Sequence, residues 1–264
     1  MKKIFIYLLL TAMVVACARV PITGRKQVNL LPESQMLSMS YTSYDQFLDS
    51  SNVVSSSDSR AQNIKSIGNK IAASVEKYMK DNKLTDRIEG FEWEFNLVQD
   101  NMVNAWCMPG GKVVFYTGIL PICETDEGIA VVMGHEIAHA IARHGNERMS
   151  QQLAIQAGGI ALSVLMDEKP EQAQNLFLLS YGVGSQLGQL AFSRQHESEA
   201  DKMGLIFMAM AGYDPREAVD FWQRMSEQSG GQQPPEFLST HPSHDTRISD
   251  LQAFLPEALE YYNP

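Results

Sequence analysis

The spacing of apolar positions predicts a chain made mainly of helices, with one small sheet. Residues 61–80 carry apolar side chains three and four positions apart, as an amphipathic helix does. Residues 91–98 alternate and are rich in aromatic side chains, which indicates a strand. Pro109-Gly110-Gly111 is a turn signal, so residues 106–118 should form a hairpin with a strong second strand. We therefore expect an α+β fold in which helices dominate.

The second half of the chain reads as a series of helices. Thr125 and the two acidic residues after it predict the start of a helix that runs to about residue 149. Because residues 129–142 are apolar nearly all round, this helix should be buried. Residues 175–190 are apolar but contain three glycines, which predicts a broken helix or a mobile loop. Further helices are expected over residues 151–166, 192–211, 215–228 and 244–254.

The N-terminus has the pattern of a targeting segment. Two lysines precede the apolar residues 4–15, a run too short for a comfortable transmembrane helix. Ala16 stands directly before Cys17, as in a bacterial lipobox, so we expect residues 1–16 to be a signal peptide and Cys17 to carry a lipid. The alternative is an ordinary signal peptide with an incidental cysteine. Residues 17–60 would then be a lipidated tether and N-terminal segment, and residues 61–264 the folded domain.

Composition narrows the choice of compartment and partner. The formal net charge is −10, which argues against a nucleic-acid partner. An exported protein meets an oxidising compartment, where Cys107 and Cys123 could pair, although two separate buried thiols are the alternative. A lipid on Cys17 would hold the protein on the periplasmic side of the bacterial envelope. Arg19 is not the aspartate that favours inner-membrane retention in some bacteria, so the outer membrane is favoured.

The strongest chemical signal is the HExxH motif formed by residues 135–139. Residues four apart project from one face of a helix, so the imidazoles of His135 and His139 can reach one ion. Glu136 lies beside that ion, where it can act as general base on a water bound to the metal. A carboxylate between two histidines in an apolar helix is costly to bury without a partner, and a zinc ion removes that cost. We therefore expect one Zn²⁺ per chain.

A tetrahedral catalytic zinc needs a third protein ligand and one open position. Residues 192–201 are the best candidate segment, because they are polar at the centre and apolar at the flanks. Glu197 and Asp201 lie one turn apart, so that one can bind metal while the other accepts an imidazole N–H. From the residues alone, the third ligand could also be one of three histidines: His144, His196 or His241.

The histidines outside the motif favour simpler roles. His144 follows His139 by five residues, about 140° around a continuous helix, so a structural or supporting role is expected. His196 is adjacent to Glu197 and should face elsewhere, and His244 should lie at the surface or at a helix start.

With ExxAD at residues 197–201, the HExxH motif resembles the gluzincin metallopeptidases of the HtpX and CAAX prenyl protease type. The most similar subgroup includes BepA, LoiP and the mitochondrial Oma-type peptidases, and the resemblance covers essentially the whole mature chain. It implies a zincin-like domain with a small antiparallel or mixed sheet beside the HExxH helix. Further segments that carry the resemblance are residues 21–27, 104–105, 109–112, 116–118 and 240–242, with Arg247.

The resemblance also implies roles for individual residues. It assigns Glu197 as the third ligand and suggests that Asp201 orients one of the two motif histidines. It places Asn104 and Ala105 on an edge strand beside the cleft, where a peptide substrate would add as a further strand. His241 or Arg247 would lie near the metal and stabilise the oxyanion of the tetrahedral intermediate. In some relatives the corresponding histidine caps the zinc and holds the enzyme latent, so both roles stay open for His241.

Together these signals predict a zinc-dependent metalloendopeptidase, anchored to a bacterial membrane, that acts in envelope protein quality control. Its partners would be polypeptides, including misfolded or unassembled envelope proteins, and the outer-membrane assembly machinery. One alternative is a chaperone-like or scaffolding lipoprotein with a latent zinc site. Another is a metal-dependent hydrolase of the cell wall or of a small amide.

Overall fold

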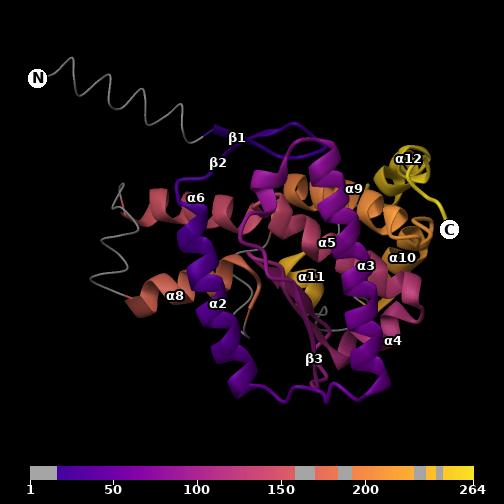
Figure 1. Ribbon diagram of the computed structural model, residues 1–264, viewed down its shortest axis with the longest axis horizontal. Helices are drawn as coiled ribbons and strands as arrows, with labels where there is room; N and C mark the ends of the chain where they lie inside the picture. Colours follow the sequence, from indigo (N-terminus) through magenta and orange to yellow (C-terminus); the bar gives the residue numbers. More distant parts are fainter. Residues whose placement is uncertain (1–16, 158–169, 184–191, 229–235, 242–245) are drawn as a thin grey trace, which may run out of the picture.

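The computed structural model describes residues 17–157, 170–183, 192–228, 236–241 and 246–264 (Figure 1). The predicted signal peptide, residues 1–16, lies outside the described residues. Helices form most of the described chain and three strands form its larger sheet, so the prediction of a mainly helical α+β fold is confirmed. In chain order the elements are β1 (Cys17–Arg19), β2 (Lys26–Val28), α2 (Glu33–Ser50), α3 (Ser59–Asp81), β3 (Glu94–Val98), β4 (Ala105–Met108), β5 (Lys112–Tyr116), α4 (Leu120–Cys123), α5 (Asp126–Ile141), α6 (His144–Ala157), α8 (Pro170–Ser180), α9 (Arg194–Met210), α10 (Glu217–Gln228), α11 (Glu236–Thr240) and α12 (Arg247–Leu259).

The larger sheet is mixed and has the strand order β3-β5-β4. Strand β5 pairs antiparallel with β4 and parallel with β3. The predicted hairpin of residues 106–118 is therefore confirmed, and its turn places Gly110 and Gly111 at φ of 83° and 78°, where glycine has no Cβ to strain. Asn104 immediately precedes β4, which is an edge strand of this sheet, and Ala105 begins it.

Helix α5 forms the centre of the larger hydrophobic core. All of its residues from Gly128 to Ile141 are buried, as its apolar composition predicts. It begins where expected, because the Thr125 side chain accepts a hydrogen bond from the Gly128 amide. It packs against α3, α9 and β4. In Figure 1, α9, α10 and α12 gather near the C-terminus, and the β1–β2 hairpin lies at the top of the view.

The segment predicted as a tether, residues 17–60, is largely folded. Strands β1 and β2 pair as an antiparallel hairpin, and the next 18-residue helix, α2, is anchored by apolar side chains. Met36 and Tyr44 of this helix are fully buried in a second core cluster with Trp106 and Phe177. Apolar residues on one face of α2 thus have partners in the domain, which is why this segment is not an extended linker. Residues 51–58, which are rich in serine, connect α2 to α3.

The helix boundaries differ from the sequence prediction mainly after the HExxH motif. The predicted helix to residue 149 ends at Ile141, and α6 begins at His144. The helix is interrupted at Arg143, whose φ of 60° lies in the left-handed region, which a right-handed α-helix does not contain. The second predicted helix, residues 151–166, is described only as far as Ala157, within α6.

The remaining helices lie close to their predicted positions. Helix α9 confirms the prediction over residues 192–211, and α10 begins at Glu217, two residues later than expected. Helix α8 covers the start of the glycine-containing stretch 175–190, whose later residues lie outside the described part of the chain. Helix α12 runs on to Leu259, beyond the expected end at residue 254. Among the helices that the structure describes, none combines the length and apolar character needed to cross a bilayer.

Candidate metal centre

Helices α5 and α9 bring three of the predicted side chains to one point. His135 and His139 lie one turn apart on α5, and Glu197 lies in the first turn of α9. The two Nε2 atoms are 3.1 Å apart. Glu197 Oε2 lies 3.5 Å from His135 Nε2, and Oε1 lies 3.4 Å from His139 Nε2. The structure therefore gathers the predicted ligand set.

His241 adds a fourth donor to this group. Its Nδ1 lies 3.2 Å from His135 Nε2 and 3.1 Å from Glu197 Oε1. The donor atoms of all four residues lie within 4.8 Å of one another, and all four residues are buried. The His241 ring is held in place by stacking on Phe237, with centroids 4.6 Å apart. Three imidazole nitrogens and one carboxylate converging in a buried space fit a tetrahedral zinc ion.

Glu136 lies beside this group but outside it. Its side chain is buried, and its Oε1 atom has no hydrogen-bond partner among the described residues. The neighbouring group is His241, whose Nε2 lies 3.4 Å away. A buried carboxylate oxygen without a hydrogen bond is costly, and a metal centre with a water beside it removes that cost. The arrangement therefore fits the predicted metal from the chain's own geometry.

Asp201 and Arg247 hold two of the predicted ligands in position through hydrogen bonds. Asp201 Oδ1 accepts the Nδ1–H of His135 at 2.9 Å, so the Nε2 atom, once it has lost its proton, directs its lone pair at the centre. Arg247 donates to Glu197 Oε2 at 3.0 Å and to Asp201 Oδ1 at 2.7 Å. Its guanidinium also stacks on Trp222, with the carbon 3.2 Å from the ring centroid. Both terminal nitrogens of Arg247 thus bind carboxylates of α9, so its predicted part in oxyanion stabilisation stays a prediction.

Burial and mutual contacts shift the pKa values of these groups. Burial lowers the pKa of His135, but hydrogen bonds with Asp201 and Glu197 raise it overall, to about 9. Burial holds the pKa of His139 well below its ordinary value. Burial would raise the pKa of Glu197, but His241 and the two motif histidines hold it well below the ordinary value. Burial raises the pKa of Glu136, which brings this carboxyl closer to the range of an effective general base.

His144 has the supporting role that the sequence predicted, but the helical angle used for it does not hold. The prediction of a 140° offset from His139 is wrong, because the helix ends before Arg143 and His144 starts the next one. The break turns the His144 ring back, so that its Nδ1 lies 2.9 Å from His139 Nδ1. No local signal in the sequence marks the left-handed break, because Arg143 lies inside the helix that was predicted to run to about residue 149.

The other predicted residues are placed as follows. His196 stacks on His144 and its Nε2 lies 3.1 Å from Glu147 Oε2, away from the metal ligands. Cys107 and Cys123 are buried and free, which corresponds to the alternative of two separate buried thiols. Burial raises the pKa of Cys107, and the charge of Glu136 adds to this effect, which indicates that strand β4 lies near the HExxH helix.

Comparison with known proteins identifies the family. The model of peptidase family M48 matches residues 58–255, about three quarters of the chain. The chain belongs to peptidase family M48. This membership confirms the predicted resemblance, and the metalloendopeptidase prediction is confirmed at the level of the family.

Individual M48 relatives are similar over much of this chain. The mitochondrial metalloendopeptidase OMA1 of Saccharomyces cerevisiae is 39% identical over 69% of this chain and 52% of its own length. The mitochondrial metalloendopeptidase OMA1 of Homo sapiens is 30% identical over 91% of this chain and 46% of its own. The beta-barrel assembly-enhancing protease of Yersinia pestis is 32% identical over 61% of this chain and 34% of its own. The chain thus spans about half the length, or less, of these relatives.

Proposed function

We propose that this protein is a zinc-dependent endopeptidase. One observation carries the proposal: His135, His139 and Glu197 meet within hydrogen-bond range of one another, beside the buried carboxylate of Glu136. Nitrogen and oxygen donors in this number suit zinc, and a free carboxylate beside them is what hydrolysis requires in addition. Membership of family M48 supports the peptide bond as the substrate.

Each residue of the centre has a separate role in the proposed hydrolysis. When bound, a zinc ion would polarise the scissile carbonyl and lower the pKa of a water molecule. Glu136 accepts the proton of the attacking water and then donates it to the leaving amine. Its raised pKa suits both transfers. Asp201 keeps His135 in the tautomer that presents Nε2, and Arg247 keeps Glu197 in place.

The position of His241 supports a latent resting form. A catalytic zinc keeps one position open, whereas His241 Nδ1 already lies with the other three donors. We propose that His241 fills the fourth position and must move before a substrate binds. His241→Ala should retain zinc through three ligands and cleave peptides faster than the wild type. Loss of zinc from this variant would instead favour a closed structural site and the chaperone-like alternative.

The proposed location and substrates rest on the sequence and on relatives. The Ala16-Cys17 pair supports a lipid anchor on the periplasmic side of a bacterial envelope, and Arg19 favours the outer membrane. The Yersinia pestis relative is named for enhancing beta-barrel assembly. By analogy we propose misfolded or unassembled envelope proteins as substrates of this chain and the outer-membrane assembly machinery as its partner. The edge strand that Ala105 begins is the proposed place for the substrate backbone. Cys17→Ser should release the protein from the membrane fraction of cells.

The test of the central proposal is the variant Glu136→Gln. It keeps the side-chain shape and removes the base, so we expect zinc to bind with wild-type affinity while cleavage of casein falls by a factor on the order of 100 or more. Glu127→Gln on the same helix is the matched control, because this partly exposed residue lies in the first turn, away from the centre. Full cleavage by the Glu136 variant would refute the assignment. A wild-type protein that binds zinc but never cleaves peptides, even with His241→Ala, would favour the scaffolding alternative.

A further inference from the structure

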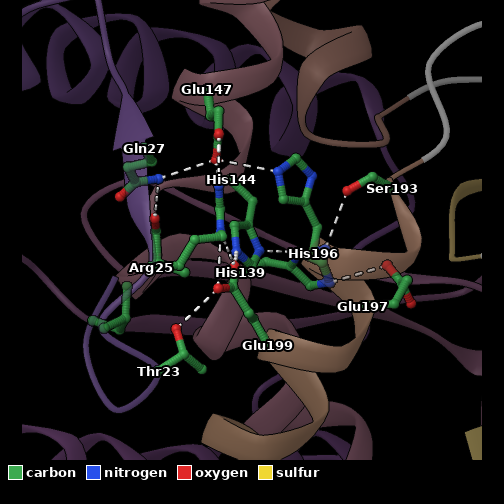
Figure 2. Close-up of polar contacts among 12 residues, drawn as sticks. Thr23, Arg25, Gln27, His139, His144, Glu147, Ser193, His196, Glu197 and Glu199 are labelled. Carbon is green, nitrogen blue, oxygen red and sulfur yellow. Dashed lines mark hydrogen bonds and ion pairs between the residues drawn. The ribbon is translucent and has the colours of Figure 1, made fainter. Parts of the chain in front are cut away.

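A second group of charged side chains lies buried beside the proposed metal centre. Figure 2 shows Arg25, Glu147, Glu199, His144 and His196 close together next to His139. The side chains of Glu147, Glu199, His144 and His196 are buried, since each of these residues is at most 6% exposed. Burying this many ionisable groups is costly unless they are fully paired. None of the group is needed as a zinc ligand, so their purpose must be sought in what they contact.

Arg25 of the loop between β1 and β2 joins the two carboxylates. Its Nε donates to both oxygens of Glu199 at 2.8 Å. Its two terminal nitrogens donate to Glu147 at 2.8 and 2.7 Å. Thr23 of the same loop adds a hydrogen bond to Glu199 Oε1 at 2.9 Å. The planar guanidinium therefore fixes the position of both carboxylates at once, which a flexible ammonium could not do.

Glu199, which Arg25 holds in place, in turn holds His144 through a hydrogen bond. Glu199 can only accept, so His144 Nε2 donates to its Oε2 at 3.1 Å. A neutral His144 has only that one proton, and its Nδ1 must then accept. The Nδ1 of His139, 2.9 Å away, is the donor. The single proton of His139 is thereby placed on Nδ1, and its Nε2 lone pair faces His135 and Glu197.

The two motif histidines are thus oriented by different means. Asp201 orients His135 directly, whereas His139 has a second histidine between it and its carboxylate. Gln27 strengthens the attachment of the hairpin by donating to the Ala142 carbonyl at 2.9 Å, at the end of α5. The contacts of the hairpin with this region are therefore largely polar and converge on the segment that joins the HExxH helix to His144.

We propose that His144 is the positioning residue for His139, and that the hairpin of residues 17–28 holds His144 in that role through Arg25 and Glu199. The proposal rests on the proposed zinc site, because its consequence is that docking of the hairpin sets the affinity of the centre for zinc. Partners of this kind around a metal ligand change metal affinity by about 10- to 100-fold when they are removed.

The first test needs no variant. In the metal-free wild-type protein, nitrogen-15 NMR of the histidine rings should show His139 with its proton on Nδ1 and His144 with its proton on Nε2. A His139 ring protonated on Nε2 would overturn the proposal, whether or not the protein binds zinc. This measurement therefore separates the failure of this proposal from the failure of the proposed peptidase function.

The second test compares zinc affinities by competition with a coloured chelator. His144→Phe removes both hydrogen bonds, and we expect zinc to bind about 10- to 100-fold more weakly. His144→Asn keeps an acceptor where Nδ1 lies, so it should restore most of that affinity. Arg25→Gln changes a residue whose hydrogen bonds go to Glu147 and Glu199 rather than to a ligand, and it should weaken binding by about tenfold. Arg224→Gln is the matched control, since this partly buried arginine binds Glu217 and a backbone carbonyl away from the centre.

Circular dichroism of the metal-free variants shows which of them remain folded, and affinities are compared among those. If His144→Phe and Arg25→Gln are folded and bind zinc as tightly as the wild type, the proposal is refuted. If Arg224→Gln weakens zinc binding as much as Arg25→Gln does, the effect is general destabilisation and the proposal is also refuted. A loss confined to the His144 and Arg25 variants, with rescue by His144→Asn, supports it.

Discussion

The two helices that carry the ligands touch at a pair of glycines, and this contact makes a quantitative prediction. Gly134 of α5 precedes His135, and Gly204 of α9 lies about two turns after Glu197. A Cβ built on Gly204 would lie 2.9 Å from both the Gly134 carbonyl carbon and the His135 amide nitrogen. These are backbone atoms of a buried helix and cannot rotate away. Gly204→Ala must therefore push the helices apart.

The size of the shift follows from the contact distance. Carbon atoms in good packing are about 3.5–4.0 Å apart, so α9 must move by about 0.6–1.1 Å near Gly204. Metal–ligand distances tolerate about 0.2 Å, so even part of this movement at Glu197 weakens the centre. Overpacking of this kind costs about 1–3 kcal/mol in stability, and the better helix propensity of alanine returns up to about 1 kcal/mol. We expect a net loss of about 1–2 kcal/mol and at least a tenfold weaker affinity for zinc.

The assay pairs urea unfolding of the metal-free protein with a zinc competition titration. Gly68→Ala is the control, because the atoms nearest to a Cβ there belong to the ring of Phe95, the closest at 2.3 Å, and not to a ligand. It should lower stability by a similar amount and leave the zinc affinity of the folded protein unchanged. If Gly204→Ala stays folded and binds zinc like the wild type, the Gly134–Gly204 contact does not set the ligand geometry and the reasoning fails.

Three further predictions concern charge at the centre. Arg247→Leu leaves the buried carboxylates of Glu197 and Asp201 without their cation, so urea unfolding should show a loss of about 3–5 kcal/mol; an unchanged midpoint would contradict this. Zinc must displace the proton of His135, whose pKa is about 9 in the metal-free centre. The zinc affinity should therefore fall as the pH falls below about 9, by up to about tenfold per pH unit. A zinc affinity that calorimetry finds independent of pH would contradict this prediction. Adding zinc at about 100 times its Kd should raise the unfolding free energy by about 2.7 kcal/mol, and a chelator should remove this gain. A melting temperature that changes with neither zinc nor the chelator would contradict a zinc site.

Local signals in the sequence were sufficient for most elements. Helix α3, the β4–β5 hairpin and the start of α5 follow from apolar spacing, a Pro-Gly-Gly turn and a Thr125 cap, all of which act between residues near in sequence. The pair His135 and His139 could be assigned to one ion for the same reason, since a single helical turn fixes their relation.

Other features depended on contacts that local reasoning cannot supply. The left-handed break at Arg143 changed the direction of His144 and invalidated the helical angle used for it. The residues predicted as a tether fold because α2 finds a buried partner in Trp106 and Phe177, which lie far along the chain. The sequence named a motif over residues 21–27 through resemblance alone, without showing that Arg25 binds Glu147 and Glu199.

The chemistry of the centre could be read from the order of residues: two imidazoles one helical turn apart, a carboxylate beside them, and a second motif rich in carboxylates. Periodicity and spacing carry this information because a helix has a fixed geometry from one turn to the next. Which groups orient each ligand depends on the packing of distant segments. Asp201 supports His135 while His144 supports His139, and His241 closes the set. These partners come from separate segments, and only the packing of α5 against α9 and the hairpin sets the distances between them.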